Sequence, residues 1–380
     1  MPTSPHAGAR PSIAIVGAGP SGCYTAQFLR KDWPDAEITV FDRHEEPFGL
    51  LRYGVAPDHL GTKALAKQLV RIFDRSGVRF VGGVEVGRTM TLADLRSRYD
   101  AVVLATGLWG DRRLPGFHPE ESATDPVGLY GAGRITRMIN AHPGRESADV
   151  RLGERTVIVG LGNVAIDLVR LLLTPPESLT EIGVPDDAVA ALGHHETRTI
   201  DVVGRSSASE AKFDAAMVRE LARFTDVAFT SDMPDAADAA DPRVAAVREL
   251  TSLPSPAAPA RRVRFHFGWT PARLEADHRV RTSVFRDVEG TRRDLRLDTD
   301  SVITAVGFTE SGQDAVRCSE LRSATSDLDR GVLDSGLYSV GWCRRGPVGT
   351  IPANRSDAKI VAATITADLV ARSSATGSAA

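Results

Sequence analysis

Two glycine-rich sequences are the residues of this chain whose types and spacing are most typical of a chemical function. The first is Gly17-Ala18-Gly19-Pro20-Ser21-Gly22 and the second is Gly160-Leu161-Gly162-Asn163-Val164-Ala165. Each follows an apolar, β-branched run and precedes a helical pattern, as a dinucleotide-binding turn requires. In such a turn the first glycine makes the bend, the second lets the backbone approach a pyrophosphate, and a small third residue allows helix and strand to pack. Two such turns predict two bound nucleotides.

The residue that ends the following strand distinguishes the two sites. Asp42 ends the predicted strand 38–42, at the spacing where an acid binds the ribose hydroxyls of an adenosine. After the second turn, the strand 199–204 is followed by Arg205 and Ser206 instead of an acid. An arginine at this position suits a 2'-phosphate. We therefore expect a flavin dinucleotide at the first site and a nicotinamide dinucleotide at the second, NADP with NAD as the alternative.

The composition is that of an ordinary globular protein and argues against several classes. The chain has 380 residues, 42% of them hydrophobic and 25% charged, with a net charge of −3. This length allows two sizeable cores, and the absence of a basic excess argues against nucleic-acid binding. No apolar run approaches a membrane span and residues 1–11 contain no apolar leader, so we expect a cytoplasmic protein without a membrane partner. Cys23, Cys318 and Cys343 form no CxxC pair and are too few for an iron-sulfur cluster, and no metal site is expected.

Two further buried strands predict how the elements around the turns are organised. One ends in Ala105-Thr106-Gly107 and the other, 301–307, has a similar glycine exit. Both resemble points where a chain crosses between two dinucleotide domains. The predicted fold is α/β with two Rossmann-like dinucleotide-binding domains, the NAD(P) domain being inserted into a split FAD domain. The expected boundaries are a disordered leader (1–11), the FAD domain (12–108 and 306–372), the NAD(P) domain (109–305) with an exposed excursion (231–259), and a disordered tail (373–380).

Four blocks spread over the chain resemble one family, the adrenodoxin reductase-like ferredoxin NADP reductases. They are Gly49-Leu50-Leu51-Arg52-Tyr53-Gly54-Val55-Ala56-Pro57-Asp58-His59, Asn140-Ala141-His142-Pro143, the segment 162–167, and the segment 340–351, which includes Gly341-Trp342-Cys343-Arg344-Arg345-Gly346-Pro347-Val348-Gly349-Thr350-Ile351. The first and last blocks are far more specific to the family than the glycine turns are.

The resemblance implies a reaction and roles for individual residues. In this family a hydride from NADPH reduces FAD, which passes single electrons to a small iron-sulfur protein. By resemblance, FAD contacts Ala105, Thr106 and Gly107 and its ring is bordered by the two specific blocks, through Gly49, Leu50, Leu51, Val55, Trp342, Gly349, Thr350 and Ile351. His59 and Trp342 are the candidates for catalytic residues. Arg344 and Arg345 are candidates for a docking face, for FAD phosphate binding, or for plain solvent exposure.

Two departures from the family pattern concern the nicotinamide site. Ser206 stands where the family commonly has a second arginine, so selectivity for NADP over NAD is expected to be weaker, with Lys212 as a possible additional phosphate ligand. Met217 stands where the family has a glutamate that points into the nicotinamide pocket. The leading interpretation is a ferredoxin-NAD(P) reductase that supplies a cytochrome P450 or similar oxygenase. The alternatives are a diverged flavoenzyme acting directly on a small molecule, as an oxidase, monooxygenase or reductase, and a subunit that holds FAD without turnover.

Overall fold

The computed structural model describes residues 10–118, 124–144, 150–194, 196–234 and 237–377, and the chain divides into two compact units. The first unit contains the chain up to Val55, His59–Gly110, and the chain from Phe308 onward. The second contains Ala56–Asp58 and Asp111–Gly307. The short strands β5 (Gly110–Asp111) and β15 (Phe308–Thr309) lie in the connections between the units. Of the expected leader and tail, residues 1–9 and 378–380 lie outside the described residues.

The first unit is built on a six-stranded sheet with the order β16-β17-β4-β1-β2-β3, in which only the edge strand β16 is antiparallel to its neighbour. Alternate side chains of β1 enter two different cores, Ile13 and Ile15 on one face and Ala14 and Val16 on the other. Burial on both faces explains why these strands are continuous apolar runs. The strands are β1 (Ser12–Val16), β2 (Glu37–Phe41), β3 (Arg79–Val81), β4 (Ala101–Leu104), β16 (Val332–Asp334) and β17 (Leu337–Ser339).

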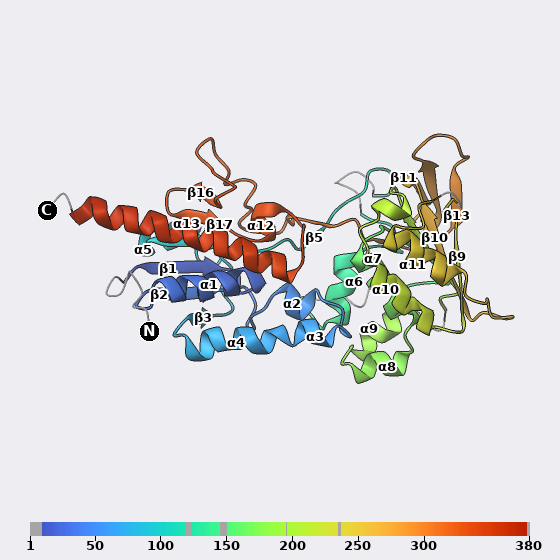
Figure 1. The fold of residues 1–380 in the computed structure, drawn as a ribbon, viewed down its shortest axis with the longest axis horizontal. Helices are drawn as coiled ribbons and strands as arrows, with labels where there is room; N and C mark the ends of the chain where they lie inside the picture. Colours follow the sequence, from blue (N-terminus) through green and yellow to red (C-terminus); the bar gives the residue numbers. More distant parts are fainter. Residues whose placement is uncertain (1–9, 119–123, 145–149, 195, 235–236, 378–380) are drawn as a thin grey trace. The chain divides into compact units, whose positions relative to one another are not determined.

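Helices cover one face of this sheet more heavily than the other. In Figure 1 the long C-terminal helix α13 (Ile351–Gly377) runs alongside α1 (Pro20–Asp32), and the indole N–H of Trp33 in the α1 cap donates to Thr366 Oγ1 of α13 at 3.2 Å. α4 (Leu65–Arg75) contributes Leu69 and Ile72 to the same core. The opposite face is covered by α5 (Leu92–Arg98) and by part of the loop 310–331. The remaining helices are α2 (Leu50–Tyr53), α3 (Leu60–Lys63) and α12 (Trp342–Arg345).

Both ends of the first unit are more ordered than the sequence suggested. Pro11 belongs to the segment 1–11 that was expected to be disordered, but its carbonyl accepts a hydrogen bond from Glu37 N at 2.9 Å. Residues 373–377, placed in a disordered tail, form the end of α13. The hydroxyls of Ser373 and Ser374 bond to the carbonyls of Leu369 and Val370, each at 3.0 Å, so polar residues here continue the helix instead of ending it.

The second unit has a six-stranded, fully parallel sheet with the order β6-β14-β7-β8-β10-β9. Ile158 of β7 enters a core lined by helices, whereas Val157 and Val159 enter a second core on the other face. That second face is covered by the antiparallel strands β11 (Trp269–Ala276), β12 (Val280–Asp287) and β13 (Leu295–Asp298). The parallel strands are β6 (Leu129–Gly131), β7 (Arg155–Val159), β8 (Thr199–Gly204), β9 (Val227–Ser231), β10 (Arg261–Phe267) and β14 (Ser301–Thr304).

One helix of the second unit corrects the sequence analysis. The segment 231–259, expected to be an exposed excursion, contains α11 (Pro242–Thr251), whose residues Val244, Val247 and Leu250 are buried in the helical core. Asp241 caps this helix by accepting from Arg243 N at 2.8 Å, and Pro242 is its first residue. The other helices are α6 (Ala132–Ile139), α7 (Asn163–Leu173), α8 (Pro176–Glu181), α9 (Asp186–Ala191) and α10 (Ala215–Glu220), with short 3-10 turns at Ala208–Glu210 and Leu221–Arg223.

Candidate functional site

The two glycine turns are geometric copies of each other, one in each unit. Gly17 has φ +108° and Gly160 has φ +137°, a region that favours glycine. A Cβ atom on Gly17 would lie 2.3 Å from the carbonyl oxygen of Ala105, and one on Gly160 would lie 2.3 Å from that of Ala305. In both units the first glycine is therefore closed in by the strand that the sequence analysis interpreted as a crossing strand.

The second glycine of each turn faces open space, in contrast to the first. A Cβ on Gly19 or Gly162 would meet no heavy atom within 4 Å. These glycines are also the N-caps of α1 and α7, and neither helix has a side chain that caps its first N–H groups. A helix N-terminus beside an open glycine is the arrangement that accommodates a pyrophosphate.

The third position of each turn is tightly packed. A Cβ on Gly22 would lie 2.0 Å from Gly17 O, and Ala165 at the equivalent position is fully buried. Ser21 is also buried, and Val164 packs against the core of the second unit. A small third residue thus performs the packing role that the sequence predicted for it.

Asp42 is fixed directly against the first turn. Its carboxylate is buried and accepts hydrogen bonds from the backbone N–H groups of Ala18 (2.7 Å) and His44 (2.9 Å). The structure therefore brings Asp42 and the first turn together.

At the second turn, Arg205 and Ser206 begin the loop after β8, and this loop returns to the glycines. Arg205 is exposed, and the Ser206 carbonyl accepts from Gly268 N at 3.3 Å. Further along, Lys212 N donates to Leu161 O at 2.8 Å, and Asp214 N donates to the side-chain oxygen of Asn163 at 2.7 Å. The end of the loop 205–214 is thus hydrogen-bonded to the second glycine turn, with which it is expected to bind the nicotinamide dinucleotide.

The first family block lies on the first turn. Phe48, whose φ of +91° is strained for a non-glycine residue, donates its N–H to Ala18 O at 2.8 Å. Gly49 has φ +47°, and a Cβ there would lie 3.2 Å from Gly19 Cα. Of the residues that follow, Leu51 is buried and Val55 packs against the same core, while Leu50 is half-buried. The block therefore lies against the backbone of Gly19 and leaves the open side of the first turn free.

Trp109 is a neighbour of this region that sequence reasoning missed. Its indole N–H donates to Thr106 O at 3.1 Å, and its ring atoms lie 3.9 Å from Cβ positions built on Gly49 and on Gly107. The Arg43 guanidinium lies over the ring, 5.2 Å from its centroid. Trp109 thus links the block at Gly49 to the Ala105-Thr106-Gly107 exit. Its position two residues beyond Gly107 was the available signal.

The second specific block meets the first turn at Gly341. This glycine has φ +75°, and a Cβ there would lie 2.1 Å from the hydroxyl of Ser21. The next residue, Trp342, stacks on Phe308 with the ring centroids 5.6 Å apart. Its indole N–H is buried and has no hydrogen-bond partner among the described residues. A buried donor without an acceptor is costly, so this atom marks a place where a ligand acceptor fits.

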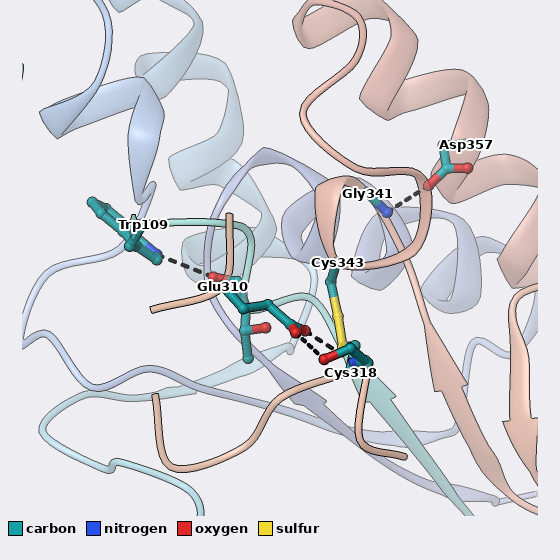
Figure 2. Close-up of a disulfide and its surroundings, with 8 residues drawn as sticks. Trp109, Glu310, Cys318, Gly341, Cys343 and Asp357 are labelled. Carbon is teal, nitrogen blue, oxygen red and sulfur yellow. Dashed lines mark hydrogen bonds between the residues drawn. A yellow bond between two sulfur atoms is a disulfide. The ribbon is translucent and has the colours of Figure 1, made fainter. Parts of the chain in front are cut away.

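Asp357 of α13 holds this block in place. Its buried carboxylate accepts from Gly341 N at 2.5 Å, as Figure 2 shows, and from the guanidinium of Arg344, and it lies 3.2 Å from Arg345 Nε. The side chains of the two arginines are only 10% and 22% exposed. Of the roles considered for Arg344 and Arg345, the docking face and plain solvent exposure do not match this arrangement, because both arginines are committed to a buried carboxylate. Arg345 also donates to Val348 O at 3.0 Å, close to Gly349, which has φ +87°.

A disulfide lies directly beside Trp342. Cys318 and Cys343 are both buried and bonded, with their Cα atoms 6.0 Å apart, and Figure 2 shows the bond beneath the turn at Gly341. It joins the loop 310–331 to α12. The two cysteines are 25 residues apart in sequence, so no local motif predicted that they form a disulfide. Cys23 is free and buried, and burial raises the pKa of its thiol strongly.

The end of the first family block contains the candidate His59 and its neighbour Asp58, which have separate surroundings. His59 is the N-cap of α3 in the first unit, and its carbonyl accepts a hydrogen bond from Lys63 N at 3.0 Å. Asp58 belongs to the second unit and pairs with Arg170 of α7, which also bonds Asp167 at 2.5 Å. Arg170 is almost completely buried, and burial lowers the pKa of its guanidinium. The role of Arg170 was missed, although Asp58 and Asp167 both lie within family blocks.

Of the two departures from the family pattern at the nicotinamide site, Ser206 lies in the loop after β8, as described above, and Met217 lies in a helix. Met217 lies on α10, half-buried against the helical core. Within the described ranges, no cluster of histidine, cysteine, aspartate and glutamate side chains is arranged to hold a metal ion. No helix in the described part of the chain is both long and apolar enough to span a membrane.

Comparisons with known proteins match this geometry. A model for an NAD(P)-binding Rossmann-like domain matches residues 15–76. The cindoxin reductase of Citrobacter braakii is 47% identical over 363 residues, covering 94% of this chain and 78% of that protein. The human mitochondrial NADPH:adrenodoxin oxidoreductase is 30% identical, covering 95% of this chain and 79% of that protein. The chain belongs to the adrenodoxin reductase-like ferredoxin NADP reductases.

A solved structure supports the membership. Mycobacterium tuberculosis FprA in complex with NADPH has a TM-score of 0.85 and 28% identity, over 97% of this chain and 86% of FprA. The predicted fold class, with two Rossmann-like domains, is confirmed, and so is the prediction that the chain is an NAD(P)H-dependent oxidoreductase. As a member of this reductase family, the protein binds a nicotinamide dinucleotide.

Proposed function

We propose that this reductase passes electrons from NADPH, or less effectively NADH, through bound FAD to a ferredoxin that supplies a cytochrome P450 or similar oxygenase. The observation that carries the proposal is the presence of two nucleotide cradles in one chain of this family. A nucleotide cradle is here a glycine turn with an open second glycine that leads into a helix N-terminus without a side-chain cap. Relatives named as reductases of cindoxin, adrenodoxin and ferredoxin support a protein as the electron acceptor.

The residues of the first unit fit FAD on two independent observations. The open space at Gly19 admits a pyrophosphate, and the buried indole N–H of Trp342 lacks an acceptor within the described residues. FAD, when bound, accepts two electrons as a hydride and releases them one at a time. We assign its site to the first turn with Asp42, to the Gly49 block, to the exit strand and to the last block. The residues are Gly17, Gly19, Pro20, Ser21, Gly22, Asp42, Gly49, Leu50, Leu51, Val55, Ala105, Thr106, Gly107, Trp342, Gly349, Thr350 and Ile351.

The chain's own groups perform distinct tasks at this site. The free N–H groups at the start of α1 offset the charge of the pyrophosphate. Asp42 accepts hydrogen bonds from ribose hydroxyls while the backbone of Ala18 fixes its carboxylate. Trp342 would donate its buried indole N–H to the flavin, and the buried side chain of Leu51 would help to keep water out of the site. We keep His59 and Trp342 as the candidates that touch the reacting groups.

The nicotinamide dinucleotide is assigned to Gly160, Gly162, Asn163, Val164, Arg205 and Ser206. Arg205 offers a bidentate cation to the 2'-phosphate, and Ser206 offers a hydroxyl in place of a second arginine. With one cation instead of two, the preference for NADPH is smaller than two arginines would give. Met217 presents no carboxylate to the carboxamide of the nicotinamide.

The test is an anaerobic titration of the purified holoenzyme. NADPH should bleach the flavin band faster than NADH does, and added ferredoxin should then make cytochrome c reduction possible. A flavin that stays oxidised with both nicotinamides would contradict the proposal and turn the search to a small molecule that reduces the flavin directly. Bleaching without any ferredoxin-dependent reduction of cytochrome c would contradict the assigned acceptor only.

A further inference from the structure

The loop that contains Arg205 and Ser206 is hydrogen-bonded to the tight turn between β10 and β11. β8 and β10 are adjacent parallel strands, with Gly204 opposite Phe267 in the register, so the chain leaves both strands at the same edge of the sheet. Gly268 forms the turn with φ +76°, a conformation that favours glycine. Its N–H donates to the Ser206 carbonyl at 3.3 Å. The backbone of Ser206 is therefore bonded directly to this turn.

Arg292, in the loop between β12 and β13, holds the turn on its carbonyl side. Its Nη2 atom donates to the carbonyl oxygens of Phe267 at 3.1 Å and of Gly268 at 3.3 Å. Its guanidinium carbon lies over the ring of Trp269, 4.0 Å from the ring centroid. A Cβ atom on Gly268 would lie 2.8 Å from Nη2 of Arg292. The guanidinium is thus packed directly against the turn.

The charge of Arg292 is offset by two carboxylates. Its Nε donates to Asp287 at 2.8 Å, and its Nη2 lies 2.6 Å from the same carboxylate, which is buried. Its Nη1 lies 3.7 Å from the carboxylate of Asp232. What Arg292 provides at this place is the planar fork of an arginine, which binds two carbonyls and stacks on an indole at once. These contacts suit a residue that fixes a backbone conformation.

Asp232, directly after β9, holds the same turn on its N–H side. Its Oδ1 accepts from Phe267 N at 2.8 Å, and its Oδ2 accepts from the indole N–H of Trp269 at 2.6 Å. The residues before and after Gly268 are therefore both fixed by one carboxylate. Together, Asp232 and Arg292 set the position of the N–H group that Gly268 donates to the next loop.

We propose that Arg292 is a positioning residue for the 2'-phosphate of NADPH and acts on it through Gly268 and Ser206. The inference rests on the proposed function, which assigns Arg205 and Ser206 to that phosphate, and it adds a specificity-determining residue that touches neither side chain. A serine hydroxyl lies one carbon from the backbone and has to come within about 3 Å of a phosphate oxygen to bond it. The backbone position of Ser206 therefore decides whether its hydroxyl reaches the phosphate. NADH carries no such phosphate and does not depend on this contact.

The experiment measures steady-state reduction of menadione, a small acceptor, by the holoenzyme with NADPH and with NADH. Arg292→Lys keeps a cation beside Asp287 and removes the planar fork. It should raise the KM for NADPH about fivefold or more and change the KM for NADH by less than about twofold, with both kcat values unchanged. Asp232→Asn, on the other side of the turn, should act in the same direction. Arg296→Lys is the matched control: this arginine of β13 is similarly exposed, bonds to Glu275 at 2.8 Å, and should match the wild type with both nucleotides.

A double-variant cycle with Ser206→Ala tests the route from Arg292 to the phosphate. In the Ser206→Ala background, Arg292→Lys should raise the KM for NADPH by less than about twofold, because the coupled contact is already lost. A full fivefold rise in that background would overturn the positioning role, and so would an equal rise for NADPH and NADH in Arg292→Lys alone. Arg205→Ala separates this inference from the function beneath it. An unchanged KM for NADPH in Arg205→Ala would overturn the 2'-phosphate assignment and the inference together, whereas an effect in Arg205→Ala and none in Arg292→Lys would overturn the inference alone.

Discussion

At the scale of single residues, substitutions of Gly17 and Gly160 give the sharpest test of the two nucleotide sites. An alanine at either position would place a Cβ atom 2.3 Å from an alanine carbonyl oxygen. We expect Gly17→Ala to weaken FAD binding by more than about tenfold and leave NADP binding intact, and Gly160→Ala to do the reverse. Each change also forces an unfavourable φ, at a cost of about 1–3 kcal/mol in the free energy of unfolding. Fluorescence titration of each purified variant with each nucleotide measures the effect.

Gly61→Ala is the matched control for both glycine variants. Gly61 lies in α3 with no heavy atom within 4 Å of a Cβ position, so this change should alter neither affinity. Equal losses of both nucleotides in Gly17→Ala would show that the two cradles are not independent sites.

Arg205 is the residue on which nicotinamide selectivity depends. Arg205→Ala should raise the KM for NADPH by about ten- to hundredfold, because a charge-assisted hydrogen bond contributes about 1.5–3 kcal/mol, and should change the KM for NADH by less than about twofold. Arg262→Ala, an exposed arginine on β10, serves as the control. Steady-state kinetics with both nucleotides measure the effect, and an equal rise for NADPH and NADH would contradict the 2'-phosphate assignment.

Among the site residues, local motifs were predictable and long-range contacts were not. The glycine turns and Asp42 follow from spacing, because a glycine turn and the acid that ends the next strand lie at a characteristic distance along the sequence. Trp109, Arg170 and Asp357 were missed because their contacts join segments far apart in sequence. A single carboxylate such as Asp357 has no sequence signature until the loop that it binds is known.

Strands β8 and β10 share a buried charge network with a predictable pH dependence. Asp201 pairs with Arg264 at 2.6 Å and with His266 at 2.8 Å, and His266 also lies 3.5 Å from Asp232. Burial alone would lower the pKa of His266, but hydrogen bonds to Asp201 and Asp232 outweigh it and raise that pKa. The protonated histidine therefore stabilises the fold fully below its ordinary pKa of about 6.5, and this contribution is lost as pH rises through the raised value.

The corresponding prediction concerns thermal stability between about pH 6 and pH 9. The Tm of the wild type should fall across this range relative to that of His266→Gln, by about 2–4 °C for each kcal/mol lost. His278→Gln, which removes a histidine exposed to 84%, should follow the wild type. Parallel Tm profiles for the wild type and His266→Gln would contradict a protonated His266.

At the scale of elements, periodicity found the buried strands but not every helix. The strands before the two glycine turns, the strands 38–42 and 199–204 and the two exit strands are continuous apolar runs and were recognised from their composition, whereas β6 and β9 were not recognised. α11 was missed because its segment is rich in alanine, aspartate and proline and shows no clear apolar period, although Asp241 and Pro242 are a standard helix start. The end of α13 was missed because serines are usually loop residues, whereas here their hydroxyls bond to the helix backbone.

For the whole molecule, each unit has its own hydrophobic core and its own assigned nucleotide. We expect two calorimetric transitions in protein stripped of flavin, one raised by FAD and the other by NADP. A ligand at one hundred times its Kd contributes about 2.7 kcal/mol to the unit that binds it. Adenosine monophosphate should have a much smaller effect. A single transition moved equally by both nucleotides would contradict independent units.

The organisation of the whole chain followed from the two exit strands recognised in the sequence. Their similar glycine exits predicted a departure from the first domain and a return to it, and the chain leaves the first unit after Gly110 and returns to it at Phe308. The assignment of Ala56–Asp58 to the second unit was not predictable, because it depends on the pairing of Asp58 with Arg170.

The closing of each glycine turn by an alanine carbonyl has a consequence for protein engineering. Ala105, which closes the turn at Gly17, lies in the first unit, and Ala305, which closes the turn at Gly160, lies in the second. Cuts in the connections at β5 and β15 therefore leave both cradles whole. Grafting the segments equivalent to 56–58 and 111–307 from a relative would transplant a complete nicotinamide module and its coenzyme preference, with the rest of the flavin module unaltered.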